Sequence, residues 1–139
     1  MSTETIYNQI YNKLITLIPN FENMEVGSHQ TSKASSFGYM DLHLDILSEE
    51  KEGRRQGKVV SLAHYYEQNG DLVPNPDMTI KIYSRSKMAE ALTFQNCYIY
   101  QEVYSIQDTI NLTLKKQLNS FLKSWLNRCI IEMGHKFTK

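Results

Sequence analysis

The segment Val59–Tyr83, VVSLAHYYEQNGDLVPNPDMTIKIY, decides the fold of this chain. Its first part is rich in apolar, aromatic and β-branched residues, and its last part alternates apolar and polar side chains. Between them, Asn69 and Gly70 form the dipeptide best suited to positive φ at both central positions of a tight turn. The segment therefore predicts a β-hairpin. Because Pro74 and Pro76 cannot donate to a strand ladder, we expect a kinked loop after the turn.

Further strands are expected on both sides of the hairpin. Apolar residues occupy every second position in residues 39–47, and residues 92–104 supply one more strand or a pair of strands. The β region thus spans residues 37–104. Residues 23–36 are small and polar without an apolar period, so we expect an irregular, mobile connection there.

Two amphipathic helices frame the β region. Apolar residues recur every three or four positions over residues 3–18 and again over residues 111–133, where Gly134 is suited to end the helix. Each apolar stripe must be buried against another element. We therefore expect an α+β fold, a two-layer sandwich in which the N-terminal and C-terminal helices pack on one face of an antiparallel sheet of four to five strands. The other face would stay exposed.

Length and composition narrow the class of protein. The chain has 139 residues, which fits a single domain over residues 1–139, and its 15 basic and 15 acidic residues cancel. This balance argues against a nucleic-acid binder that relies on bulk charge. We see no export signal and no apolar run long enough to cross a membrane, so a cytoplasmic protein without membrane contact is expected. Cys97 and Cys129 have no metal or redox spacing, and no cofactor is expected.

Asp41, His43 and Asp45 form the first candidate site. Residues at i, i+2 and i+4 on a strand project to one side, so two neighbours in this trio can share a metal ion. A third ligand would come from His64 or from the loop after the hairpin turn. However, His64 has the parity of the apolar residues in its own strand, which favours a buried position away from the trio.

A general acid–base site is the second candidate. His64 with Asp71 or Asp77 would supply a base and a carboxylate that orients it. The chain contains no nucleophile motif, glycine-rich phosphate loop or paired-carboxylate pattern that supports this chemistry. Aspartates beside a turn more commonly shape the turn and cap its amides.

Tyrosines on the exposed sheet face form the third candidate site. Rings with basic neighbours can stack on bases or anchor a partner protein, although tyrosine also stabilises sheets by cross-strand pairing. The predicted binding residues are Lys81, Tyr83, Arg85, Tyr98, Tyr100 and Tyr104.

Three blocks carry a family resemblance: HYYEQNGDLVPNPDM at 64–78, MAEALTFQ at 88–95 and LNSFLKSWL at 118–126. With them the chain resembles the YqiB-like family of uncharacterised bacterial domains over nearly its whole length. The resemblance implies a small cytoplasmic bacterial protein, sometimes associated with mobile elements, and brings no established activity. Where some members have Tyr-His-Asp-Ala before the second block, this chain has YSRSK at 83–87, so no role of that His–Asp pair carries over.

Taken together, these patterns predict a non-catalytic binding or regulatory module. Its exposed sheet face, with the loop at residues 69–77, would engage a protein or a single-stranded nucleic acid. Two alternatives stay open: a small metal-assisted enzyme, and a homodimer that uses the same face.

Overall fold

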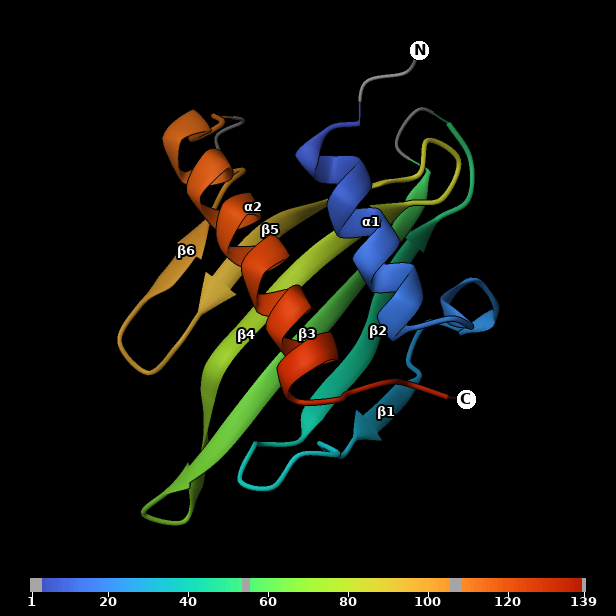
Figure 1. Ribbon diagram of the computed structural model, residues 1–139. Coiled ribbons are helices and arrows are strands. Elements are labelled where there is room, and N and C mark those ends of the chain that lie inside the picture. Colours follow the sequence, from blue (N-terminus) through green and yellow to red (C-terminus); the bar gives the residue numbers. More distant parts are fainter. Residues whose placement is uncertain (1–3, 54–55, 106–108, 139) are drawn as a thin grey trace.

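The computed structural model describes residues 4–53, 56–105 and 109–138 and shows an α+β fold. One open antiparallel sheet contains six strands in the order β1-β2-β3-β4-β5-β6, so each strand pairs with its neighbours along the chain. Both α-helices lie on the same side of this sheet (Figure 1). The elements are α1 (Ile6–Leu17), β1 (His29–Ser32), β2 (Leu42–Glu50), β3 (Gly57–Gln68), β4 (Asp71–Tyr83), β5 (Met88–Gln95), β6 (Tyr100–Glu102) and α2 (Leu112–Asn127). The α+β class is confirmed, with one or two strands more than expected.

Side chains at the helix starts explain where the helices begin. Thr5 caps α1, because its hydroxyl accepts from the Asn8 amide at 3.3 Å while the Asn8 side chain accepts from the Thr5 amide at 3.1 Å. The Asn111 side chain accepts from the Leu114 amide at the start of α2. The helix expected over 3–18 is therefore shorter, and residue 3 lies outside the described residues. The helix expected over 111–133 ends in a π-helical turn, Arg128–Glu132.

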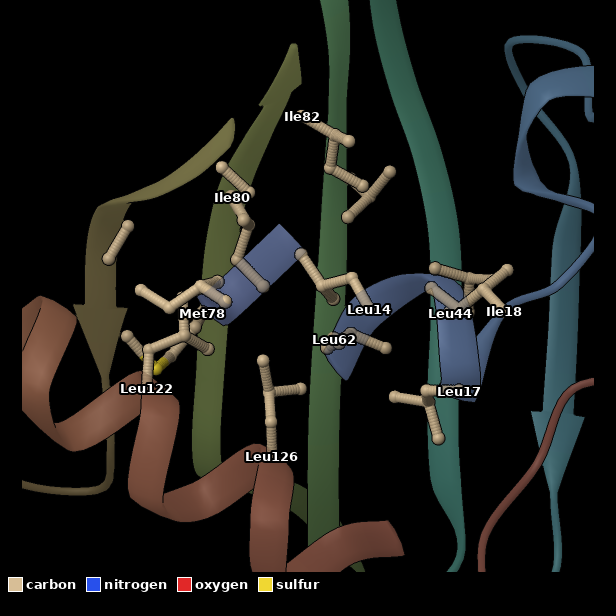
Figure 2. Close-up of a cluster of buried hydrophobic side chains, with 14 of the residues drawn as sticks. Leu14, Leu17, Ile18, Leu44, Leu62, Met78, Ile80, Ile82, Leu122 and Leu126 are labelled. Carbon is tan, nitrogen blue, oxygen red and sulfur yellow. The ribbon is translucent and has the colours of Figure 1, made fainter. Parts of the chain in front are cut away.

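The core lies between the helices and the sheet (Figure 2). Cross-strand pairing aligns Leu44, Leu62 and Met78 in one row that faces the helices. Leu14 of α1 and Leu126 of α2 are fully buried above the sheet. Each such side chain contributes about 1.5–3 kcal/mol on leaving water, which is what holds the two layers together.

The Asn69–Gly70 turn forms as the sequence predicts, with φ of 53° and 86° at its two residues. The expected kinked loop is wrong, because β4 begins directly after the turn and runs through Pro74 and Pro76. Its ladder with β3 is nevertheless irregular there: Tyr65 pairs with Pro74, while Ala63 pairs with Asp77. The two prolines, which lack an amide hydrogen, thus interrupt the pairing with β3 but do not end the strand.

The expected irregular stretch over residues 23–36 contains a strand. His29–Ser32 pairs with β2 along its whole length. The C-terminal segment also holds this region, because the Lys136 amide donates to the Ser32 hydroxyl. The next residue contacts α1 instead: the Phe137 amide donates to the Leu17 carbonyl at 2.8 Å. Backbone pairing and these tertiary contacts, rather than an apolar pattern, therefore order residues 29–32.

The sheet face turned away from the helices is called the open face here. Within the described residues no helix covers it (Figure 1). No described helix is long and apolar enough to cross a membrane. The strand side chains on the open face include His29, Thr31, His43, Asp45, Ser61, Tyr65, Asp77, Thr79, Lys81, Tyr83 and Glu90.

Candidate functional site

The open face carries a hollow of about 690 Å³ over β3, β4 and β5. These strands form its floor, and Tyr104, Thr109 and Ile110, which lie between β6 and α2, form its wall. Three of the six predicted binding residues, Lys81, Tyr83 and Tyr104, line this hollow. The complete lining is Val59, Lys81, Tyr83, Glu90, Leu92, Tyr104, Thr109 and Ile110. We call it the Glu90 hollow.

Glu90 binds three neighbouring polar groups at once. The Tyr83 hydroxyl donates to one carboxylate oxygen at 2.7 Å, and the Tyr104 hydroxyl donates to the other oxygen. The Lys115 ammonium lies 3.6 Å from that second oxygen and donates to the Tyr104 hydroxyl at 2.9 Å. The same ammonium lies over the rings of Tyr7 and Tyr104, at 5.6 and 5.4 Å from their centroids.

These contacts fix the protonation states around the carboxylate. Burial, reinforced by the hydrogen bond to Glu90, raises the pKa of Tyr104. The hydrogen bond to Tyr104 and the charge of Glu90 raise the pKa of Lys115. At neutral pH Tyr104 is therefore a neutral phenol and Lys115 an ammonium, and both contact Glu90 at the rim of the hollow. Sequence reasoning did not single out Glu90 or Lys115 as site residues: Glu90 appears only within the MAEALTFQ block of the resemblance, which brings no activity, and Lys115 belongs to no motif.

Lys81 is not a free cation. Only 8% of its surface is exposed, its ammonium lies 2.7 Å from the Glu50 carboxylate, and it lies 5.3 Å from the Tyr83 ring centroid. Because Glu50 balances its charge, Lys81 contributes the aliphatic part of its side chain to the lining of the hollow and adds no unpaired charge.

The other three predicted binding residues lie elsewhere. Arg85 is in the turn between β4 and β5 and lines a separate hollow of about 160 Å³. Tyr98 is almost fully exposed in the turn between β5 and β6, and the Tyr100 hydroxyl donates to Glu102 at 3.4 Å. The structure thus does not gather the six residues into one surface.

The three candidate metal ligands do not form one group, because β2 begins after Asp41 and, of the three, contains only His43 and Asp45. Asp41 precedes the strand and lies 3.5 Å from the Lys33 ammonium, whereas His43 and Asp45 point to the open face. Within the described residues no three His, Cys, Asp or Glu side chains are grouped so that they can hold a metal ion.

The neighbours of His43 and Asp45 come instead from β1. His29 contacts Asp45 at 2.8 Å, its ring stacks on the His43 ring at 5.7 Å between centroids, and the Thr31 hydroxyl lies between the two rings. Sequence reasoning missed His29 and Thr31 because it interpreted their segment as irregular. The register of β1 on β2 was the signal, and it is visible only once the strands are paired.

The predicted catalytic histidine faces the helices. His64 is 1% exposed, donates from Nδ1 to the Asp41 carbonyl at 2.9 Å, and lies 3.8 Å from the Cys129 sulfur through Nε2. Burial lowers the pKa of His64, and burial also raises the pKa of the Cys129 thiol to about 12. Both groups are therefore neutral at physiological pH.

The two predicted aspartates do not join His64. Asp77 points to the open face, where it accepts from the Ser61 hydroxyl at 2.9 Å and from the Tyr65 hydroxyl at 3.4 Å. Asp71 is the first residue of β4, beside the hairpin turn. An acid–base site built from these three residues does not form in this structure.

The comparisons with known proteins give one match. The family model described as a domain of unknown function, DUF6908, matches residues 9–134. Neither the curated proteins nor the solved structures contain a significant match. The expectation of an uncharacterised domain is confirmed at that level, while the YqiB-like name and the bacterial origin stay predictions. Because the match covers most of the chain, the protein belongs to the DUF6908 family.

Proposed function

We propose that this protein is a binding module that engages a protein partner through a hollow in its open face, and that this hollow has no catalytic role. The observation that carries this proposal is the Glu90 hollow, a site of about 690 Å³ whose charged lining residues, Lys81 and Glu90, are each paired with a partner just outside it, Glu50 and Lys115. The bacterial cytoplasmic setting, and the association with mobile elements, that the YqiB-like resemblance implies belong to the same proposal.

The lining of the hollow favours an apolar or aromatic anchor. Val59, Leu92 and Ile110 contribute apolar surface, and Tyr83 and Tyr104 contribute rings whose hydroxyls are occupied by Glu90. Protein interfaces concentrate their binding energy in a few such anchors, which fill well-packed pockets. A partner side chain that enters the hollow therefore displaces water from apolar surface without breaking an ion pair.

Charge favours a protein over a nucleic acid. Single-stranded nucleic acids bind in grooves that carry unpaired positive charge beside aromatic rings. Here Lys81 is paired with Glu50 and Lys115 with Glu90, while Asp45 and Asp77 add carboxylates to the same face. A phosphate backbone would meet these carboxylates, whereas basic residues that flank the anchor of a partner protein would be attracted to them.

Partner capture from the host tests the proposal. We expect a Leu92→Arg variant, which puts a charge into the hollow, to lose a partner that the unchanged protein retains. Leu72→Arg is the matched control, because Leu72 is strongly exposed at the β3–β4 hairpin and does not line the hollow. Circular dichroism checks that both variants fold, and cross-linking of the purified partner must place it on the open face.

Each alternative predicts a different result. Equal capture by the Leu92→Arg variant and the unchanged protein would exclude the Glu90 hollow as the anchor. Binding of fluorescent oligothymidine with affinity lowered by Leu92→Arg would favour the nucleic acid, and a dimer lost in the same variant would favour self-association. Capture lost instead in a Tyr98→Ser, Tyr100→Ser double variant would move the contact to the β5–β6 turn.

A further inference from the structure

A carboxylate, an imidazole and a hydroxyl follow one another at the β1–β2 end of the open face. Asp45 Oδ1 lies 2.8 Å from His29 Nδ1, and His29 Nε2 lies 3.2 Å from Thr31 Oγ1. Strand pairing creates this order, because His29 is directly opposite Asp45 and Thr31 is the next β1 residue on the same face. Both distances are within the range found between a nucleophile, its base and the group that orients the base.

The hydrogen bonds determine where the protons are. An ionised carboxylate only accepts, so the His29 Nδ1–H group donates to Asp45. In the neutral imidazole Nε2 then carries a lone pair, which can accept from the Thr31 hydroxyl. His43 Nδ1 lies 3.2 Å from the same oxygen, so a His43 tautomer with a proton on Nδ1 would donate to it. The Thr31 hydroxyl is thus aimed at a base that a carboxylate holds in the required tautomer.

We propose that Thr31 is a nucleophile for acyl transfer, with His29 as its general base and Asp45 as the residue that positions His29. Thr31 Oγ attacks the carbonyl carbon of an ester, and its proton passes to His29 Nε2. The C–O bond of the ester then breaks, and His29 returns the proton to the departing alcohol. Water, deprotonated by His29, hydrolyses the acyl-threonine in the second half of the reaction, which restores the hydroxyl.

Thr31 also lines a hollow of about 320 Å³ at the edge of the sheet, together with Gln30, Lys136, Phe137 and Thr138. The hollow shares no residue with the Glu90 hollow, so this inference stands independently of the proposed binding function.

A purely structural role explains this arrangement less well. His29 and Asp45 are 51% and 41% exposed, and ion pairs in such positions contribute little to stability because water screens them. Exposure also leaves the Thr31 hydroxyl open to a reagent. The order from carboxylate to imidazole to hydroxyl is therefore better accounted for by reactivity than by folding.

Acetylation by p-nitrophenyl acetate tests the inference. Release of nitrophenolate gives the rate, and mass spectrometry of peptides locates the acetyl group. We expect Thr31 to be acetylated, with the rate at this residue falling about 100-fold in His29→Gln, because a positioned general base contributes at least that factor. Thr31→Val should abolish the labelling at this position, and Asp45→Asn should slow it.

Thr109 is an internal control, because its hydroxyl bonds to the Ser105 hydroxyl and not to an imidazole. Lysine acetylation in the same sample gives the background reactivity of the reagent. Labelling of Thr31 no faster than of Thr109, or equally fast in His29→Gln, would overturn the inference. An acetyl group found on the His29 ring, with Thr31 unmodified, would also overturn it. Unfolding curves confirm that each variant keeps the fold.

Discussion

The rings of His64 and His135 lie 5.8 Å apart, centroid to centroid, and both are buried. His64 Nδ1 donates to the Asp41 carbonyl at 2.9 Å, and His135 Nε2 donates to the Met40 carbonyl at 3.1 Å. Two neighbouring backbone carbonyls just before β2 are thus held by histidines from β3 and from the C-terminal segment. Because the two rings are buried and close together, a positive charge on either ring is unfavourable, and a charge on both is more so.

Acid should therefore destabilise the protein. Burial lowers the pKa of both His64 and His135 below the ordinary value of 6.5, with the charges of His43 and Arg128 acting in the same direction on His64. The unfolded chain then takes up protons before the folded chain does. The free energy of unfolding should fall as the pH drops below 6.5, by at most about 1.4 kcal/mol per pH unit for each histidine.

Urea unfolding between about pH 8 and pH 5 measures this dependence. His135→Gln should flatten it, because one of the two titrating rings is gone. A slope that is the same in His135→Gln as in the unchanged protein would show that the buried pair is not responsible.

Lys58 should be important for stability despite its charge. Its ammonium donates to the carbonyls of Phe21, Glu22 and Met24 at 2.7–2.8 Å, around the short 3₁₀ turn Phe21–Asn23. Lys58→Met leaves the Glu22 and Met24 carbonyls without this donor, while the Phe21 carbonyl keeps the Met24 amide, and the change should cost about 3 kcal/mol in chemical denaturation. Lys33→Met is the matched control, because Lys33 is exposed and should change stability by less than about 0.5 kcal/mol. Equal effects in the two variants would contradict this role.

Asn119 should protect one amide of β5. Its side-chain oxygen accepts from the Ala91 amide at 2.8 Å, and its nitrogen donates to the Lys115 carbonyl at 2.8 Å, in a fully buried position. Asn119→Leu leaves the Ala91 N–H without a partner, at a cost of about 2 kcal/mol. Hydrogen exchange at Ala91 should accelerate by more than the global loss of stability explains. Asn127→Ala serves as control, since the Asn127 side chain is exposed and accepts from the Lys13 ammonium at the surface.

Glu90 should control the ionisation of Tyr104. Both the hydrogen bond and the negative charge of Glu90 raise the pKa of Tyr104, beyond the effect of burial. In Glu90→Gln the charge is gone, so the pKa of Tyr104 should fall. Nuclear magnetic resonance of labelled tyrosines can follow this ring during an alkaline titration, with Tyr100 as an internal reference. An unchanged or higher pKa of Tyr104 would contradict the charge arrangement described for the hollow.

The parts of the fold that the sequence predicts are those with a local pattern. The Asn69–Gly70 turn depends on two adjacent residues, and the helices depend on an apolar period within a single segment. His64 likewise has the parity of the apolar residues in β3, and it lies on the face that this parity predicts. In each case the deciding residues are close together in the chain.

The parts that escape prediction depend on distant partners. His29–Ser32 has no apolar alternation, and it becomes a strand only because β2 and the C-terminal segment supply its hydrogen bonds. Glu90 and Lys115 are separated by a strand, a turn and the start of a helix, so nothing in either segment predicts their ion pair. The candidate site was therefore only partly predictable: Tyr83 and Tyr104 are recognisable as surface aromatics, but the carboxylate that unites them is not.

The hydrogen bond from the Phe137 amide to the Leu17 carbonyl also constrains the order in which the structure is completed during synthesis. The strands pair with their chain neighbours, so they can assemble one hairpin after another as they leave the ribosome. The end of α1 emerges early, yet this bond must wait until residue 137 has been released. Until then, α1 of a nascent chain lacks this contact at its C-terminal end.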